Sequence, residues 1–246
     1  MNLEFIPVKT RAFLPPKDEI WEAIDSLEVG EKDIVFISSK IIAIHQGRTT
    51  KVGTIKKEDL IKKEADRYLH YENKDSGYGV NLTVSHGVLI PAAGIDESNA
   101  NGYYILWPEK IDEFCREVRK KLMKKFNLKE LGVVATDSHT TPLRWGVTGF
   151  AIGLSGVEPT KDIRGEEDIF GRKIKITKID MIDPLAAMAV NVMGESSERT
   201  PILIAKNCQH MIFSDKASME GFKIAPEMDI YRPLLETLPP VDRRHF

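Results

Sequence analysis

The sequence predicts an α+β fold in which mixed and antiparallel sheets pack against helices. Apolar runs of strand length occupy residues 34–37, 131–136 and 201–205, and amphipathic helical spacing is clearest over residues 111–126. Strands and helices do not alternate strictly along the chain, so a doubly wound parallel sheet is not expected. Gly, Pro and Ser are scattered rather than gathered into a linker. We therefore expect residues 1–246 to form one unit, with two intertwined subdomains as the alternative.

Helices are predicted where apolar residues recur at helical spacing between recognisable ends. Ile20, Ile24 and Leu27 form such a stripe, which Gly30 closes. The same reasoning predicts helices over residues 17–30, 58–71, 108–126 and 183–194. Cys115 falls on the apolar stripe of the third helix, so we expect it to belong to the core.

Strands are predicted from short apolar or alternating runs bounded by turn residues. Residues 80–85 and 88–90 form an expected hairpin around His86-Gly87, and residues 173–180 alternate as a half-exposed strand. The three glycines within residues 149–156 indicate either close backbone packing or room for a ligand.

Two of the buried strands end in small polar residues, which is a common place for functional groups. Residues 34–37 run into Ser38-Ser39-Lys40, which we expect to form a ligand loop. Residues 131–136 run into Asp137-Ser138, where the strand would fix the side chains and the following loop would expose them.

The composition excludes several classes of protein. With 42% hydrophobic and 29% charged residues, the chain can bury a substantial core. A formal net charge of -2 gives no general attraction for nucleic acid or an anionic membrane, and no run approaches the ~20 apolar residues of a membrane span. Cys115 and Cys208 form neither a disulfide framework nor a CxxC motif. We expect a cytoplasmic protein with no nucleic-acid partner and no membrane association.

Familiar nucleotide-binding motifs are absent from the sequence, while acids in loops suggest metal chemistry. There is no GxxxxGK[ST] and no GxGxxG, so a nucleotide would have to be held without a P-loop. Asp96, Asp137 and Glu195 stand beside hydroxyl and amide side chains, which together suit a hard cation such as Mg²⁺. Each acid taken singly is more often a cap or a turn residue.

Two further side chains have both a functional and a structural interpretation. Arg144 is able to clamp a phosphate or carboxylate through two hydrogen bonds, but a structural ion pair explains it equally well. His139 lies beside Asp137, although the six histidines show no zinc-binding spacing and a plain loop histidine is the simpler interpretation.

Several segments, in order along the chain, resemble the coenzyme F420 γ-glutamyl ligase family. The matching segments are Pro7-Val8, Arg11-Ala-Phe-Leu14, Gly94-Ile-Asp-Glu-Ser-Asn99, Thr136-Asp-Ser138, residues 144–156, Asp168-Ile-Phe-Gly-Arg172 and Met193-Gly-Glu195. Their order and spacing make a chance similarity improbable.

This resemblance implies a γ-glutamyl ligase-like α+β fold and a homodimer. It also implies ATP or GTP as co-substrate and two divalent cations, Mg²⁺ or Mn²⁺. The residues that match metal ligands are Asp96, Asp137, Ser138 and Glu195. The residues that match nucleotide contacts are Arg11, Ala12, Phe13, Leu14, Ser39, Lys40, Asn99, Met193, Gly194, Glu195, Ser196, Ser197, Glu198, Arg199 and Thr200.

The chain departs from the family pattern where the acceptor would be recognised. Ile44 stands where the family has a lysine, and Thr140-Thr141 stands where it has Gly-Arg. The family's Leu-Leu-Pro-x-Asp-Pro-Asp is altered at residues 105–110. Residues 103–108 and 140–146 resemble instead a bacterial branch described as folate-metabolism γ-glutamate ligases, so the acceptor stays open between a folate and a deazaflavin.

The expected reaction joins L-glutamate to a small coenzyme acceptor through an acyl phosphate. In this hypothesis, Lys40 and Arg144 are the candidates for stabilising charge on the phosphates. Two alternatives remain: the same scaffold acting on another amine or only releasing phosphate, and a nucleotide-binding regulator without catalysis, which the replacement at Ile44 motivates.

Overall fold

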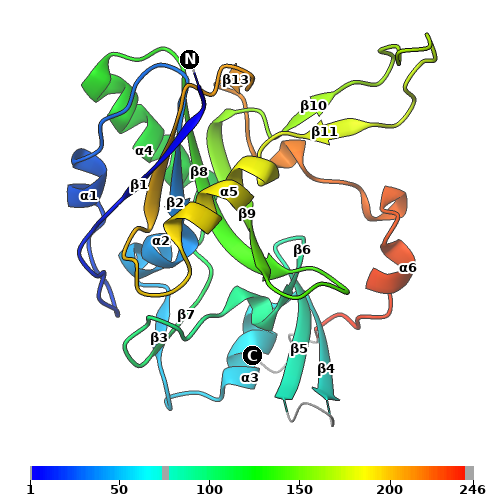
Figure 1. Ribbon diagram of the computed structural model, residues 1–246. Coiled ribbons are helices and arrows are strands. Elements are labelled where there is room, and N and C mark those ends of the chain that lie inside the picture. Colours follow the sequence, from blue (N-terminus) through cyan, green and yellow to red (C-terminus); the bar gives the residue numbers. More distant parts are fainter. Residues whose placement is uncertain (1, 74–77, 242–246) are drawn as a thin grey trace.

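The computed structural model describes residues 2–73 and 78–241, and a six-stranded sheet forms its centre (Figure 1). In spatial order the strands are β1 (Glu4–Val8), β12 (Ile202–Lys206), β2 (Asp33–Ser38), β8 (Leu131–Thr140), β9 (Val147–Val157) and β13 (Phe213–Ser214). Strands β2 and β8 run parallel, and every other neighbouring pair in this sheet is antiparallel. The mixed sheet agrees with the predicted fold class.

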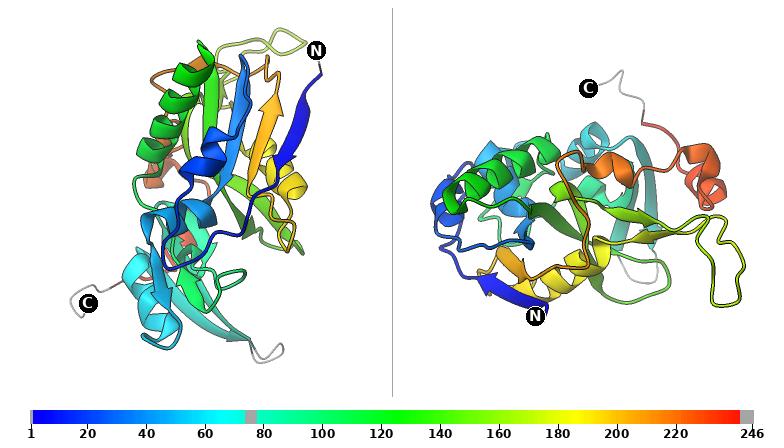
Figure 2. Two further views of the ribbon diagram at one scale, coloured as in Figure 1. Left: turned by 90° about the vertical axis from the view of Figure 1, so that its left-hand side faces the viewer. Right: turned by 90° about the horizontal axis from the view of Figure 1, so that it is seen from above.

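Helices cover both faces of this sheet. Helix α4 (Ile111–Phe126) packs on one face and α5 (Asp183–Met193) on the other (Figure 2). Each face has its own hydrophobic cluster, and Cys115 is buried in the cluster on the α4 side. Covered on both faces, β2 is apolar at successive positions rather than at alternate ones.

The glycines of β9 allow both helices to approach the sheet closely. A Cβ atom on Gly149 would lie 2.5 Å from the Cβ of Val190 on α5. A Cβ atom on Gly153 would lie 2.2 Å from Cγ2 of Ile111 on α4. Of the two interpretations of this segment, close backbone packing is therefore confirmed.

A second group of elements lies beside the main sheet, in the lower part of Figure 1. It contains α3 (Lys57–Glu64), β3 (Thr49–Lys51), β4 (Arg67–Asn73), β5 (Tyr78–Ser85), β6 (Val88–Pro91), η1 (Ala92–Gly94) and β7 (Tyr103–Ile105). Strands β4, β5 and β6 form one sheet, and β3 pairs with β7. Leu60, Ile61, Ile95 and Leu106 belong to a separate hydrophobic cluster here.

The remaining elements connect these parts and extend from them. They are α1 (Trp21–Asp25), α2 (Ser39–Gln46), β10 (Thr160–Asp162), β11 (Lys178–Asp180), η2 (Met219–Gly221), η3 (Pro226–Met228) and α6 (Arg232–Leu235). The β10–β11 ribbon projects from the body (Figure 1). The tail returns to the second group of elements, where Leu238 is buried and its carbonyl accepts a hydrogen bond from Arg67. No helix within the described ranges is long and apolar enough to cross a membrane.

Several predicted helices and strands are shorter than expected. The charged helix predicted over residues 58–71 ends at Glu64, because the next residues pair with β5 as strand β4. The helix predicted over residues 17–30 is reduced to α1, although its apolar stripe is buried as expected. The strand predicted over residues 173–180 begins only at Lys178, since Lys173 forms a separate bridge with Glu167.

Two predicted loops at the ends of buried strands are part of regular structure. Ser39 begins helix α2, so residues 38–40 are not a free loop. Strand β8 continues to Thr140, because its pairing with β9 resumes beyond a register shift at Ala135/Thr136. Asp137 and Ser138 therefore lie within a strand rather than after it.

Candidate active site

A cavity of about 410 Å³ opens at the carboxyl ends of the parallel strands β2 and β8. Ligands of open sheets commonly bind at this edge. The cavity is lined by Thr10, Arg11, Ala12, Phe13, Ser38, Ser39, Lys40, Ile41, Ile44, Asp96, Asn99, Thr136, Asp137, Ser138, Val190, Met193, Gly194, Glu195, Ser196, Ser197, Glu198, Arg199, Thr200 and Pro201. Residues predicted from five separate segments of the chain thus meet in one place.

Helix α2 positions Lys40 in this cavity. Ser38 is extended and Ser39 begins the helix, so Lys40 lies in its first turn. The Lys40 Nζ lies 2.6 Å from Oδ2 of Asp96 and donates to the carbonyl of Ser98 at 2.8 Å. The ammonium group of Lys40 is therefore held against the loop that carries Asp96.

The Asp96 carboxylate is fixed by its own loop. Its Oδ1 accepts from the backbone N–H groups of Glu97 at 2.6 Å and Ser98 at 2.8 Å. Burial alone would raise the pKa of Asp96, but the hydrogen bond and charge of Lys40 outweigh it and hold this pKa below its usual value. Asp96 is therefore ionised at neutral pH.

The second carboxylate, Asp137, is held from two sides. Its Oδ1 accepts from the backbone N–H of Ser138 at 2.8 Å, and its Oδ2 accepts from the indole N–H of Trp107. Burial raises the pKa of Asp137 to about 6, and the negative charge of Asp96 acts in the same direction. Two carboxylates that repel one another at the edge of a buried cavity favour a positively charged ligand.

Sequence reasoning did not identify Trp107 as part of the site. Its side chain is buried, and it packs so tightly on Gly94 that a Cβ atom there would lie 2.3 Å from the indole nitrogen. Gly94 also has a φ of +72°. The signals in the sequence were that residues 105–110 depart from the family pattern and that residues 103–108 resemble the folate-metabolism branch.

The loop of residues 193–200 forms a further part of the cavity lining. The side-chain amide of Asn99 donates to the carbonyl of Ser196 at 2.8 Å, which joins this loop to the Asp96 loop. The backbone N–H of Thr10 donates to the carbonyl of Arg199 at 2.9 Å. Three separate segments are thereby held together around one space.

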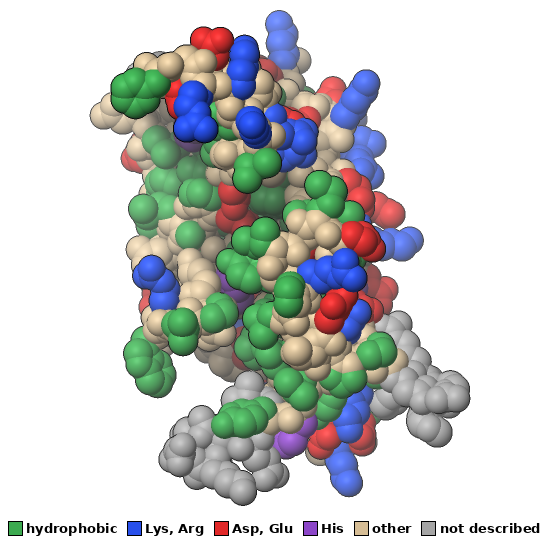
Figure 3. Space-filling model, turned by 90° about the vertical axis from the view of Figure 1, so that its right-hand side faces the viewer, with side chains coloured by type: hydrophobic (Ala, Val, Ile, Leu, Met, Phe, Trp, Pro, Cys, Tyr) green, Lys and Arg blue, Asp and Glu red, His purple; other side chains and the backbone are tan. Residues whose placement is uncertain are grey.

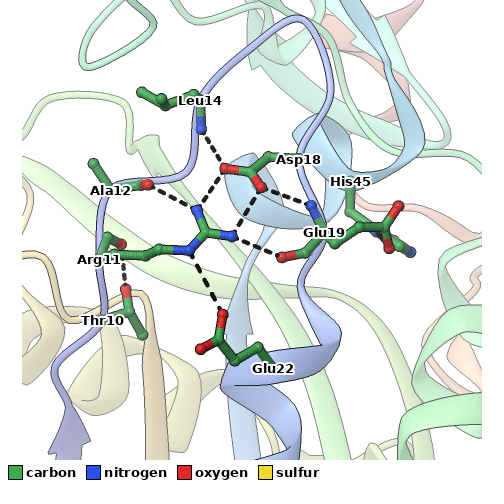
Figure 4. Close-up of polar contacts among 8 residues, drawn as sticks. All are labelled: Thr10, Arg11, Ala12, Leu14, Asp18, Glu19, Glu22 and His45. Carbon is green, nitrogen blue, oxygen red and sulfur yellow. Dashed lines mark hydrogen bonds and ion pairs between the residues drawn. The ribbon is translucent and has the colours of Figure 1, made fainter.

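Arg11 shapes the cavity wall through a network drawn in Figure 4. Its guanidinium donates to both oxygens of Asp18, at 2.6 and 2.8 Å, and to the carbonyl of Ala12. The hydrogen bond from Arg11 lowers the pKa of Asp18 to about 2. The prediction that Arg11 contacts a nucleotide remains untested, and the structure gives its guanidinium an internal carboxylate partner.

Two predicted site residues lie outside the lining of this cavity. Arg144 is in the loop between β8 and β9, where its backbone N–H donates to the carbonyl of Thr141. Leu14 is exposed, and its backbone N–H donates to Asp18. The expectation that Arg144 stabilises charge on the phosphates together with Lys40 stays a prediction.

The oxygen atoms of the cavity suit a hard divalent cation, but the protein side chains do not provide a complete set of metal ligands. Asp96, Asp137 and Ser138 contribute oxygen atoms, and Glu195 lines the cavity from an exposed position. Within the described ranges, no three His, Cys, Asp or Glu side chains are grouped closely enough to hold a metal ion. Mg²⁺ is commonly bound by one or two carboxylates together with substrate phosphates, so the residues fit a cation shared with a nucleotide. The assignment of Asp96, Asp137, Ser138 and Glu195 as metal ligands stays a prediction.

The fold and the cavity define a class of protein: an α+β protein whose polar cavity, with two carboxylates and a lysine, is built without a P-loop. The chain belongs to the F420 ligase family, since the model of F420-0:Gamma-glutamyl ligase matches residues 16–207. The resemblance seen in the sequence is confirmed at this level.

Curated relatives match nearly the whole chain. The coenzyme F420:L-glutamate ligase of Methanopyrus kandleri is 31% identical over 94% of this chain and 98% of its own length. The protein of the same name from Methanococcus maripaludis strain C7 is 32% identical, over 86% and 89%. That of Archaeoglobus fulgidus is 27% identical, over 96% and 99%. These relatives are archaeal, so the assignment to a bacterial folate branch stays a prediction.

Proposed function

We propose that this chain is a nucleoside-triphosphate-dependent γ-glutamyl ligase that adds L-glutamate to a small coenzyme acceptor. The observation that carries the proposal is the single cavity in which Lys40, Asp96, Asp137 and the loop of residues 193–200 converge. Relatives that match most of the chain are named as coenzyme F420:L-glutamate ligases. Coenzyme F420 is accordingly the first acceptor to test, and a folate is the second.

The reaction that we propose has two displacement steps. A carboxylate oxygen of the acceptor attacks the γ-phosphorus of ATP or GTP, and the nucleoside diphosphate leaves with the electrons of the broken P–O bond. The free amine of glutamate then attacks the acyl carbon, the acyl–oxygen bond breaks, and phosphate leaves. The proton lost by the amine passes to water. No protein nucleophile is needed, so positioning and charge stabilisation carry the catalysis.

The residues of the cavity have distinct parts in this scheme. Lys40 offers a cation to the phosphate oxygens at the edge of the cavity where Asp96 holds it. Asp96 and Asp137, with the hydroxyl of Ser138, are the groups that would hold Mg²⁺ or Mn²⁺. When bound, such cations would neutralise part of the negative charge of the triphosphate.

The experiment that tests this function measures phosphate release and product mass for the wild-type chain. The assay contains glutamate, Mg²⁺ or Mn²⁺, ATP or GTP, and either coenzyme F420 or a folate. We expect phosphate release that depends on both acceptor and glutamate, with a product heavier by one glutamyl residue. Nucleotide binding without phosphate release under every combination would contradict the proposal. It would favour the alternative that the chain is a nucleotide-binding regulator without catalysis.

A matched pair of variants tests the site within that assay. Asp137→Asn removes the charge of the buried carboxylate and should lower turnover by orders of magnitude while the fold survives. Asp25→Asn is the control, because Asp25 pairs with Lys121 at 3.0 Å on the surface. Unchanged turnover in Asp137→Asn would remove Asp137 from the catalytic site.

We also propose that the chain forms a homodimer through the face shown in Figure 3. Hydrophobic side chains gather on that face, which carries the β8–β9 loop, the β10–β11 ribbon and the tail. The exposed residues of these segments include Leu143, Trp145, Ile169, Phe170, Ile176, Met228, Ile230 and Tyr231. So many exposed large apolar side chains are typical of an interaction surface.

Sedimentation of a surface variant tests this interface. Phe170→Asp places a charge on the β10–β11 ribbon segment and should shift the protein towards the monomer mass. Leu3→Asp is the control, because Leu3 is also an exposed apolar residue but lies next to the edge strand β1. A monomeric wild type, or an unchanged dimer in Phe170→Asp, would argue against this interface.

A further inference from the structure

A second cavity, of about 550 Å³, adjoins the first along helix α5. It is lined by Val147, Thr148, Gly149, Pro184, Ala187, Met188, Val190, Asn191, Gly194 and Glu195. Val190, Gly194 and Glu195 also line the first cavity, so the two spaces share one wall. A ligand long enough to pass this wall would reach the phosphate-binding region from the second cavity.

The lining of this cavity combines residues of α5 with the first residues of β9. Pro184, Ala187, Met188 and Asn191 recur at helical spacing on the side of α5 that is turned away from the core. Gly149 brings the start of β9 against the same helix, because its missing side chain leaves room for Val190. The cavity is therefore bounded by helix on one side and by the first residues of β9 on the other.

The charge of this lining selects among the substrates of a ligase. Its lining contains no Lys or Arg, and its one ionisable side chain is the carboxylate of Glu195. A triphosphate or the two carboxylates of free glutamate would be repelled there rather than paired. Pro184, Met188 and Val147 instead offer apolar and polarisable contacts of the kind that hold a flat ring.

We infer that the second cavity binds the flat ring portion of the acceptor, with the acceptor's reactive carboxylate directed into the first cavity along the wall of Val190, Gly194 and Glu195 that the two cavities share. This inference rests on the proposed ligase function, since it assigns one of the three substrates of that reaction. Gly194 has a φ of +80°, and a Cβ atom there would lie 2.4 Å from Cδ of Glu198. The Glu198 side chain therefore packs directly on Gly194 at the wall that the two cavities share.

Two variants of the second cavity test the inference by different means. Ala187→Trp fills the cavity without adding charge, and Met188→Glu adds a second carboxylate to its lining. Val52→Glu is the control, because it places the same charge at an exposed apolar residue outside both linings. For each protein, KM is measured for acceptor, nucleotide and glutamate, with coenzyme F420 and a folate as the acceptors.

The expected result is a selective effect on the acceptor. Both cavity variants should raise the KM for the acceptor at least about tenfold, while the KM values for nucleotide and glutamate stay within about twofold. Val52→Glu should behave as the wild type. An unchanged KM for the acceptor in a folded Ala187→Trp or Met188→Glu would overturn the inference, and a change confined to oligomeric state would assign this groove to a contact between copies.

Failure of the proposed function is distinguishable from failure of this inference. Direct titration of coenzyme F420 and of the folate into each protein, without nucleotide, reports acceptor binding in the absence of turnover. Wild-type binding that both cavity variants weaken supports the inference even if no glutamate is added. No binding of either probe to the wild type overturns the assignment of the cavity together with the choice of acceptor.

Discussion

The indole N–H of Trp107 donates a hydrogen bond to Oδ2 of Asp137, and Trp107 belongs to the hydrophobic cluster on the α4 side of the central sheet. Trp107 follows strand β7, and Asp137 lies on β8. The position of the indole is set in turn by Gly94, on which it packs. The orientation of the buried carboxylate therefore depends on residues that belong to a different part of the fold.

Replacing Trp107 by Phe should impair activity more than stability. The change keeps an aromatic ring but removes the N–H donor, so a half-buried carboxylate oxygen loses a partner at a cost of about 1–3 kcal/mol. Groups that orient a metal-binding side chain typically contribute about 10–100-fold to activity or metal affinity. We expect a fall in kcat of that order, measured beside the metal concentration needed for half-maximal rate.

Trp21→Phe is the matched control for this change. Trp21 packs against His45 and Phe114, with ring centroids 5.4 and 5.9 Å away, and it does not line the cavity. Its replacement should leave kcat and the metal requirement unchanged. Equal losses of activity in Trp107→Phe and Trp21→Phe would show that the indole of Trp107 serves packing alone.

Replacing Gly94 by Ala should displace Trp107. The backbone at Gly94 has a φ of +72°, and the added Cβ would meet the indole nitrogen at 2.3 Å. Gly87 provides the control, because its φ is +78° and nothing lies within 4 Å of the Cβ position. Both variants carry the backbone penalty of about 1–2 kcal/mol. Thermal unfolding and turnover should show a larger loss for Gly94→Ala, and equal losses would refute the steric argument.

The parts of the fold that the sequence predicts well are those whose signals are local. Helix α5 begins with Asp183-Pro184 and is followed by Gly194, and it has the predicted bounds to within a residue. Strand β12 was expected over residues 201–205 and is Ile202–Lys206. In contrast, α2 was missed, because the β-branched apolar residues after Lys40 continue the pattern of the preceding strand.

The candidate site could be predicted only in part, because its contacts join distant segments. The resemblance to the family named the residues that line the cavity, whereas the partner of each one depends on the fold. Lys40 and Ser98 are 58 residues apart, and Trp107 and Asp137 are 30 apart. Arg11 is the opposite case, since its partner Asp18 is seven residues away and occupies the guanidinium that sequence reasoning assigned to a nucleotide.

Replacing Asn99 by Ala should loosen the cavity without unfolding the protein. The change removes the 2.8 Å hydrogen bond to the carbonyl of Ser196, which joins the two loops that face one another across the cavity. We expect the KM for nucleotide to rise several-fold, which corresponds to about 1 kcal/mol for one hydrogen bond. Asn101→Ala is the control. Asn99 and Asn101 both have a positive φ, of 52° and 47°, so each variant replaces an asparagine by alanine in the same unfavourable backbone conformation. The same KM in both variants would count against a role for the Ser196 contact.

Asp183 should make the stability of the protein depend on pH in a direction opposite to that of most carboxylates. Its Oδ1 accepts from the backbone N–H of Ala151 on β9 at 2.8 Å, at the first turn of α5. Burial, with a smaller effect from nearby Asp180, raises the pKa of Asp183 to about 6. In the unfolded chain this pKa is about 3.9, so between these values the folded state binds the proton more tightly.

The contribution of Asp183 to the free energy of unfolding therefore decreases as pH rises from about 4 to about 6 and is constant above that range. Asp183→Asn removes this titration while its amide oxygen still accepts from Ala151. Thermal midpoints of both proteins at pH 5 and pH 7 isolate the effect, because other groups titrate alike in the two. On going from pH 7 to pH 5, the free energy of unfolding of the wild type should rise relative to that of the variant, by on the order of 1 kcal/mol. Parallel pH profiles would mean that Asp183 is ionised in the folded protein at both pH values, so that the strand and the helix meet around a charged carboxylate rather than a neutral one.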